Sequence, residues 1–232
     1  MKRFCFLVSL ILCLWPRAAA AASPSRPFEF GFKTGLVVSN THGDSLSGDF
    51  GGVSVSQKSR TGFFGDVFVS CRIAKQLAVQ PEIQYVQKGV KFEGSQDLMG
   101  STLTVKGGIS IPYVEVPLLL KFLVPASGST KPSLYAGPAF GFKTSTGLTA
   151  SADWGGTSVP ITSADLDPIR QQIDQSLKKT DVSLAFGGSV DIGHLVFDLR
   201  YTLGLTNIID AGSGATGSIK NTAFQLMAGY RI

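Results

Sequence analysis

Apolar and polar residues alternate with a period of two along most of the chain, and this alternation limits what it can fold into. In FEFGFKTGLVV, Phe28, Phe30 and Phe32 fall on one face of an extended strand, while Glu29 and Lys33 fall on the other. Successive side chains of a β-strand point to opposite faces. The pattern therefore predicts strands with one apolar and one polar face, and it excludes a chain built mainly of helices.

Eight segments share this alternation, and most have the roughly 9–11 residues that a tilted membrane strand needs. They are residues 28–38, 60–73, 77–88, 109–122, 134–143, 182–192, 195–205 and 224–232. The connections alternate between short (74–76, 125–131, 193–194) and long (39–59, 93–108, 145–180, 206–220). Short turns at one end and long loops at the other are typical of outer-membrane barrels, whose short turns face the periplasm.

We therefore predict an all-β fold, an eight-stranded antiparallel up-and-down transmembrane β-barrel. It has short periplasmic turns, long outer loops and both termini in the periplasm. One long loop should carry a short helix over residues 167–179. There Asp167 can cap the helix and Pro168 suits its first position, while Ile169, Ile173 and Leu177 form an apolar stripe.

The first residues have the features of a leader. MKRFCFLVSLILCLWPRAAAAAS has a basic start, an apolar core and a small-residue end, which predicts a signal peptide over residues 1–22 and a barrel domain over residues 23–232. Removing Lys2, Arg3 and Arg17 lowers the formal net charge from +5 to +2. No polybasic run then remains to indicate nucleic acid, and Cys71 alone cannot form an internal disulfide.

Alternation alone does not say which face meets solvent, because a soluble lipocalin-like periplasmic carrier also has eight strands. The apolar face favours the membrane arrangement, since it is nearly free of charge. It also carries aromatic residues towards the strand ends, as interfacial girdles require. These are Phe28, Phe30, Tyr85, Phe122, Phe142 and Tyr230.

The polar face should then line the barrel interior. Its predicted lumen charges are Glu29, Lys33, Arg60, Asp66, Arg72, Glu82, Lys88, Glu115, Lys121, Lys143, Asp181, Asp191, Asp198, Arg200 and Arg231. An eight-stranded barrel is only wide enough for its interior side chains. We therefore expect a packed network of paired charges and no open pore.

Several stretches together resemble the PorT-like outer-membrane β-barrel domain family of Gram-negative bacteria, from about residue 28 to residue 232. They are LAVQPEIQYVQKGVKF, YVEVPLLLKF, YAGPAFGFK, FDLRYTLGLTNI and FQLMAGYRI. The resemblance implies an eight-stranded barrel among the lipids of the outer membrane. One member of the family is tied to a protein-secretion machinery. The C-terminus is similar to the signal read by the barrel-assembly machinery, with Gly229, Tyr230 and Ile232 in the matching positions, although the usual last residue is aromatic.

The sequence points to interaction more than to catalysis. No phosphate loop, metal-ligand cluster or nucleophile elbow is present, so we expect no cofactor or metal. His42, with Asp44 and Ser45, has the residue types of a surface lipid hydrolase or acyltransferase, but such triads are defined by geometry. We expect a structural or interaction role, such as an accessory of an envelope or protein-secretion complex. The lipid-modifying enzyme centred on His42 is the alternative.

Overall fold

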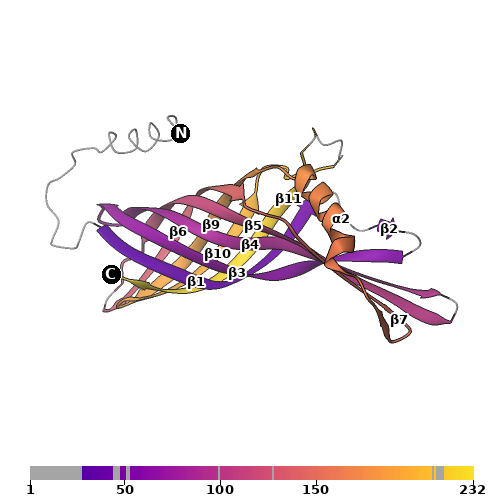
Figure 1. Ribbon diagram of the computed structural model, residues 1–232. Helices are drawn as coiled ribbons and strands as arrows, with labels where there is room; N and C mark the ends of the chain where they lie inside the picture. Colours follow the sequence, from indigo (N-terminus) through magenta and orange to yellow (C-terminus); the bar gives the residue numbers. More distant parts are fainter. Residues whose placement is uncertain are drawn as a thin grey trace.

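The computed structural model describes residues 28–43, 48–50, 53–98, 100–126, 128–210, 212 and 217–232. Eight strands form a closed antiparallel ring (Figure 1). They are β1 (Phe28–Gly43), β3 (Val53–Ala74), β4 (Leu77–Leu98), β5 (Ser101–Leu123), β6 (Thr130–Lys143), β9 (Thr180–Ile192), β10 (Leu195–Gly204) and β11 (Ile219–Arg231). Pairing between β1 and β11, from Gly31↔Arg231 to Gly43↔Ile219, closes the ring. Each predicted segment coincides with one of these strands, so the predicted eight-stranded barrel is confirmed.

The barrel has two different ends. The turn end carries the turns at residues 75–76 and 193–194, the connection 124–129, the start of β1 and the C-terminus (Figure 1). Gly193 there has a φ of +60°, which suits glycine at the first position of a two-residue hairpin turn. The loop end carries the longer connections.

Three strands run far beyond the loop end of the ring. β3 and β4 have 22 residues each and β5 has 23, about twice the length that a membrane strand needs. With β2 (Gly48–Phe50), β7 (Gly147–Trp154) and β8 (Thr157–Val159) they form an outer sheet that continues from the barrel. The prediction of loops at residues 39–59 and 93–108 was therefore wrong for most of their described residues. Outside lipid a strand no longer needs one uniformly apolar face, so alternation marks the barrel strands only.

A β-bulge lies where β3 leaves the ring. The pairing of β3 with β1 ends at Ser39↔Arg60, and the register of β3 against β4 shifts between Ser59 and Phe64. An extra residue in one strand bends that strand and increases its twist. The bulge thus re-aims the outer sheet relative to the barrel wall.

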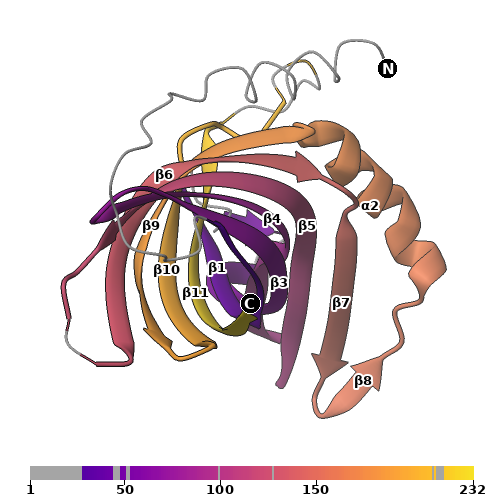
Figure 2. The same ribbon diagram turned by 90° about the vertical axis from the view of Figure 1, so that its left-hand side faces the viewer.

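Helix α2 (Ser163–Ser176) follows β8 and lies beside the loop end of the ring (Figure 2). It begins earlier than the predicted Asp167, because the Asp165 carboxylate accepts hydrogen bonds from the Thr162 backbone N–H at 2.9 Å and from its hydroxyl at 2.6 Å. It ends before residue 179, since Leu177 is extended and bridges to Ile209. In the described part of the chain, no helix is long and apolar enough to cross a membrane.

The outer surface of the barrel is apolar and the interior is polar, as the alternation predicts. Leu36, Phe63, Leu118 and Leu226 are about half exposed on the outside, whereas their neighbours in sequence point inward. The six predicted girdle aromatics are all exposed on the outer face. The register places Phe28, Phe30, Phe122 and Tyr230 near the turn end, and Tyr85 and Phe142 nearer the loop end. This arrangement is the inverse of a lipocalin, so the soluble-carrier alternative was wrong.

The two faces of β11 provide a test of orientation. Leu226 lies about halfway along β11 and faces out, 56% exposed, so Leu226→Arg should cost about 2–4 kcal/mol. Gln225 is fully buried inside, and Gln225→Asn should cost less because the side chain stays polar and uncharged. Urea unfolding in lipid vesicles measures both changes, with Leu226→Phe as the control. Equal destabilisation by Leu226→Arg and Gln225→Asn would contradict the assignment of faces.

Candidate functional site

The centre of the lumen is organised around a buried lysine. The Lys33 ammonium lies 2.9 Å from a Glu82 oxygen, 2.9 Å from an Asp198 oxygen and 3.3 Å from an Asp66 oxygen. These groups come from four strands, β1, β3, β4 and β10, so the cluster ties together distant parts of the ring. Gly229 makes room for it, because a Cβ there would lie 2.7 Å from Lys33 Cγ.

Arg200 is the second cation of this cluster and is also buried. Its guanidinium lies 2.8 Å from Glu82, and it donates to the Gln84 side-chain oxygen at 3.0 Å and to the Tyr135 hydroxyl at 3.2 Å. Tyr135 in turn donates to Asp198. Since Glu82 accepts from both Lys33 and Arg200, the two cations share one carboxylate and the whole set acts as a single network.

The network continues towards the loop end. Lys88 donates to Glu115, and the Gln84 amide donates to the other oxygen of the same carboxylate. Further along, Asp181 accepts from the Thr206 hydroxyl at 2.8 Å and from the Asn221 amide at 2.9 Å. Lys88, Glu115 and Asp181 are therefore each paired or hydrogen-bonded within the barrel.

An apolar plug closes the lumen near the loop end, and the sequence did not reveal it. Its buried members are Val37, Phe64, Val86, Ile111, Tyr113, Ile208, Ile219, Ala223 and Met227. Several sit at inward positions, which we expected to be polar throughout. In the sequence, an apolar residue at an inward position, such as Phe64, only weakens the alternation. That such residues contact one another becomes visible only in the closed ring. Charge network and plug together leave the interior filled.

Seven of the predicted lumen charges lie at the ends of the barrel. Lys143 reaches the Asp174 side chain of α2 at 2.8 Å, outside the central network. Arg231 bridges Glu29 at 2.8 Å and Asp191 at 2.9 Å at the turn end. Arg60, Arg72 and Lys121 have no ion pair or hydrogen bond through their side chains among the described residues. Arg60 lies at the loop end, and the other two lie at the turn end.

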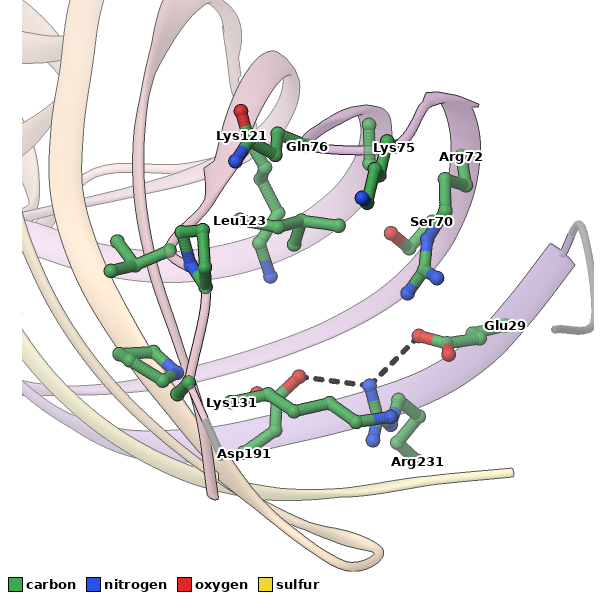
Figure 3. Close-up of a pocket in the computed structure, with 15 residues that line it drawn as sticks. Glu29, Ser70, Arg72, Lys75, Gln76, Lys121, Leu123, Lys131, Asp191 and Arg231 are labelled. Carbon is green, nitrogen blue, oxygen red and sulfur yellow. Dashed lines mark hydrogen bonds and ion pairs between the residues drawn. The ribbon is translucent and has the colours of Figure 1, made fainter. Parts of the chain in front are cut away.

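A pocket of about 240 Å³ opens at the turn end (Figure 3). Its charged lining residues are Glu29, Arg72, Lys75, Lys121, Lys131, Asp191 and Arg231, five cations against two carboxylates. Figure 3 shows the Glu29–Arg231–Asp191 bridge forming one wall, with Arg72 and Lys75 opposite. Both carboxylates of the pocket are thus already paired with Arg231. The other four cations line the remaining walls of the cavity.

A larger hollow, of about 770 Å³, lies on the outer sheet, and we call it the loop-end groove. Its charged lining residues are Lys58, Arg60, Lys91, Glu93 and Lys106. Glu93 contacts Lys58 and lies 3.3 Å from Lys106, and hydrogen bonds from these two lysines lower the pKa of its carboxyl group. Arg60 and Lys91 add further positive charge, so the groove carries four cations and one anion.

The remaining candidate residues are His42 with its predicted triad partners and the predicted assembly signal. His42 is exposed near the end of β1, opposite Lys220 of β11, while Asp44 and Ser45 lie outside the described residues. No group of three His, Cys, Asp or Glu side chains within the described ranges could hold a metal ion. In the predicted assembly signal, Gly229 packs against the β1 backbone, Tyr230 stacks on His194, and Ile232 donates its N–H to the Phe30 carbonyl at 2.8 Å.

Replacing Lys33 tests the central network. Lys33→Met should destabilise the barrel by about 3–5 kcal/mol, because three buried carboxylates would be left with Arg200 alone. Adding Asp66→Asn should recover part of the loss, since one of those carboxylates is then neutral. Lys58→Met, which removes the cation of an exposed pair, should change the unfolding free energy little. If Lys33→Met resembled Lys58→Met in urea unfolding, the network would not hold the barrel together.

The contact between α2 and β6 predicts a pH dependence. Hydrogen bonds from Lys143 and Thr146 hold the pKa of Asp174 below its ordinary value. The stability that this contact gives to helix docking is therefore complete above the ordinary aspartate pKa and is lost as pH falls through the lowered pKa. A fluorophore on Gln171→Cys, in a Cys71→Ser background, should gain mobility only at acid pH. Asp174→Asn should make it mobile at neutral pH, and equal anisotropy in both proteins at every pH would refute the contact.

Comparison with solved structures found small outer-membrane barrels at low identity. Neisserial surface protein A shares 14% identity, with 89% of this chain and 96% of that chain covered and a TM-score of 0.44. OprG from Pseudomonas aeruginosa shares 12% identity, with 88% and 95% covered and a TM-score of 0.41. Ail of Yersinia pestis shares 14% identity, with 88% and 99% covered and a TM-score of 0.40.

The comparison with family models identifies the family of the chain, which the single structures do not. No curated protein matched the sequence. The family model described as outer membrane protein beta-barrel domain matches residues 18–210, well over half of the chain. The protein therefore belongs to the outer-membrane β-barrel domain family.

Proposed function

We propose that this outer-membrane protein has a structural and interaction role and does not conduct solutes. The observation that carries the proposal is the contrast between a filled lumen and an outer sheet that continues well beyond the barrel. The sheet presents the loop-end groove, in which four cations face one carboxylate. Long elements on a rigid barrel are natural contact surfaces.

The orientation follows the plan of outer-membrane barrels. We place the turn end and both termini in the periplasm and the loop end outside the cell. The outer sheet and α2 would then meet partners at the cell surface. An acidic partner fits the groove best, because Arg60 and Lys91 have no ion pair in the described part of the chain.

Two finer assignments belong to the same proposal. We assign the chain to the PorT-like branch of the family, on the stretches that resemble it, and we propose an accessory role in an envelope or protein-secretion complex. The barrel-assembly machinery would read the C-terminal strand at Gly229, Tyr230 and Ile232. The register supports this, since β11 is the strand that pairs with β1 to close the ring.

The enzyme alternative has weaker support. A histidine base needs an orienting acid and a nucleophile within hydrogen-bond reach. Opposite His42 on the neighbouring strand β11 stands Lys220, which is no acid. We therefore propose that the protein is not a lipid-modifying enzyme.

Cross-linking in native envelopes tests the proposed interaction. Partner capture by the wild-type protein should fall at least several-fold in Lys91→Glu and Lys106→Glu, because reversing groove charges repels an acidic partner. Lys179→Glu makes the same charge change at an exposed residue outside the groove, and capture should persist. Capture that fell equally in all three variants, or in none, would argue against the groove as the binding face.

A further inference from the structure

The turn-end pocket contains a buried lysine whose role in the barrel is unexplained. Lys121 is only 6% exposed, and it lines both the main pocket and the narrow extension that leads towards Lys33. In the described part of the chain, its ammonium has no hydrogen bond and no ion pair. Burying a charge without a partner is costly, so such a group marks a place where another charge belongs.

The neighbouring acids are already occupied. Asp191 and Glu29 both hold Arg231, at 2.9 Å and 2.8 Å. Asp191 keeps one buried oxygen without a hydrogen bond, and it attracts Lys121 from beyond ion-pair distance. A single distant carboxylate oxygen cannot balance the other cations of the pocket as well.

Those other cations come from separate parts of the barrel. Arg72 lies near the end of β3, Lys75 lies in the β3–β4 turn, and Lys131 lies near the start of β6. None of the three side chains has a hydrogen bond or an ion pair with any described residue. With Lys121 from β5 they surround the cavity, and Figure 3 shows Arg72 and Lys75 across it from Arg231. The five lining cations and two carboxylates leave a formal charge of +3.

From this geometry we propose that the turn-end pocket binds a phosphate group. A phosphate carries nearly two negative charges and three acceptor oxygens, enough to accept from cations on several walls. A carboxylate offers one charge and two oxygens, which matches fewer of them. The Ser70 hydroxyl, which also lines the pocket, can add a neutral donor. The site is separate from the loop-end groove, so neither proposal depends on the other.

Titration of the folded protein with inorganic phosphate tests the pocket, with calorimetry or phosphorus NMR as the readout. The wild type should show one saturable site. Lys121→Met should weaken binding about tenfold, since a charge-assisted hydrogen bond is lost. Asp191→Asn should tighten binding, because it removes a negative charge from the cavity. Lys179→Met, at the opposite end, should leave the affinity unchanged.

The controls separate a built pocket from general attraction. Heat-modifiable gel mobility checks that each variant has folded, and Arg72→Gln replaces Lys121→Met if the latter does not fold. The absence of a saturable site, or equal weakening by Lys121→Met and Lys179→Met, would overturn the proposal. So would an Asp191→Asn protein that binds more weakly than wild type while its fold is intact.

Lipid nanodiscs then identify the source of the phosphate. If a lipid headgroup occupies the pocket, discs that contain phosphatidic acid, a phosphate monoester, should compete with inorganic phosphate and lower its apparent affinity relative to phosphatidylcholine discs. If the natural ligand is a soluble phosphate compound, the affinity should be equal in both kinds of disc, and glycerol phosphate should bind with the same dependence on Lys121.

Discussion

A strand in lipid has no water to satisfy its backbone N–H and C=O groups, and the architecture of this protein follows from that constraint. The ring must close, so β11 pairs with β1 along thirteen residue pairs. Closure fixes an inside and an outside, and every second side chain must then suit one or the other. The apolar outer face and the polar inner face are two consequences of the same hydrogen-bonded ladder.

Closure also explains how charged side chains can be buried in the interior, because it brings opposite charges together. Lys33 is 49 residues from Glu82 and 165 from Asp198, yet the ring brings an oxygen of each carboxylate to 2.9 Å from the Lys33 ammonium. Such pairs do not favour folding by themselves, because desolvating each charge offsets much of the attraction. Their effect is on specificity: a register slip of one residue would move Lys33 into lipid and leave its three carboxylates facing Arg200 alone.

These relations decide what could be predicted from the sequence. The strand positions and faces could be predicted, because lipid requires an apolar residue at each outward position, as at Leu36 and Leu226. That charged residues such as Glu82 and Arg200 face the lumen could also be predicted. Which charges pair with each other could not be predicted, because the pairing depends on the stagger between strands. The plug around Phe64 and Met227 could not be predicted for the same reason. The outer sheet could not be predicted because residues 93–108 lie outside the barrel wall, where a strand needs no apolar outer face.

Paired and unpaired charges lie in different parts of this barrel. In the middle of the barrel, Lys33, Arg200 and Lys88 each form an ion pair with a carboxylate, so these cations are paired within the protein. At the two ends, cations outnumber acids, in the turn-end pocket and in the loop-end groove. Lys121 is buried and has no ion pair or hydrogen bond among the described residues, unlike the cations of the middle. The excess positive charge at the two ends therefore supports the two proposed binding sites, and the filled centre keeps these sites separate.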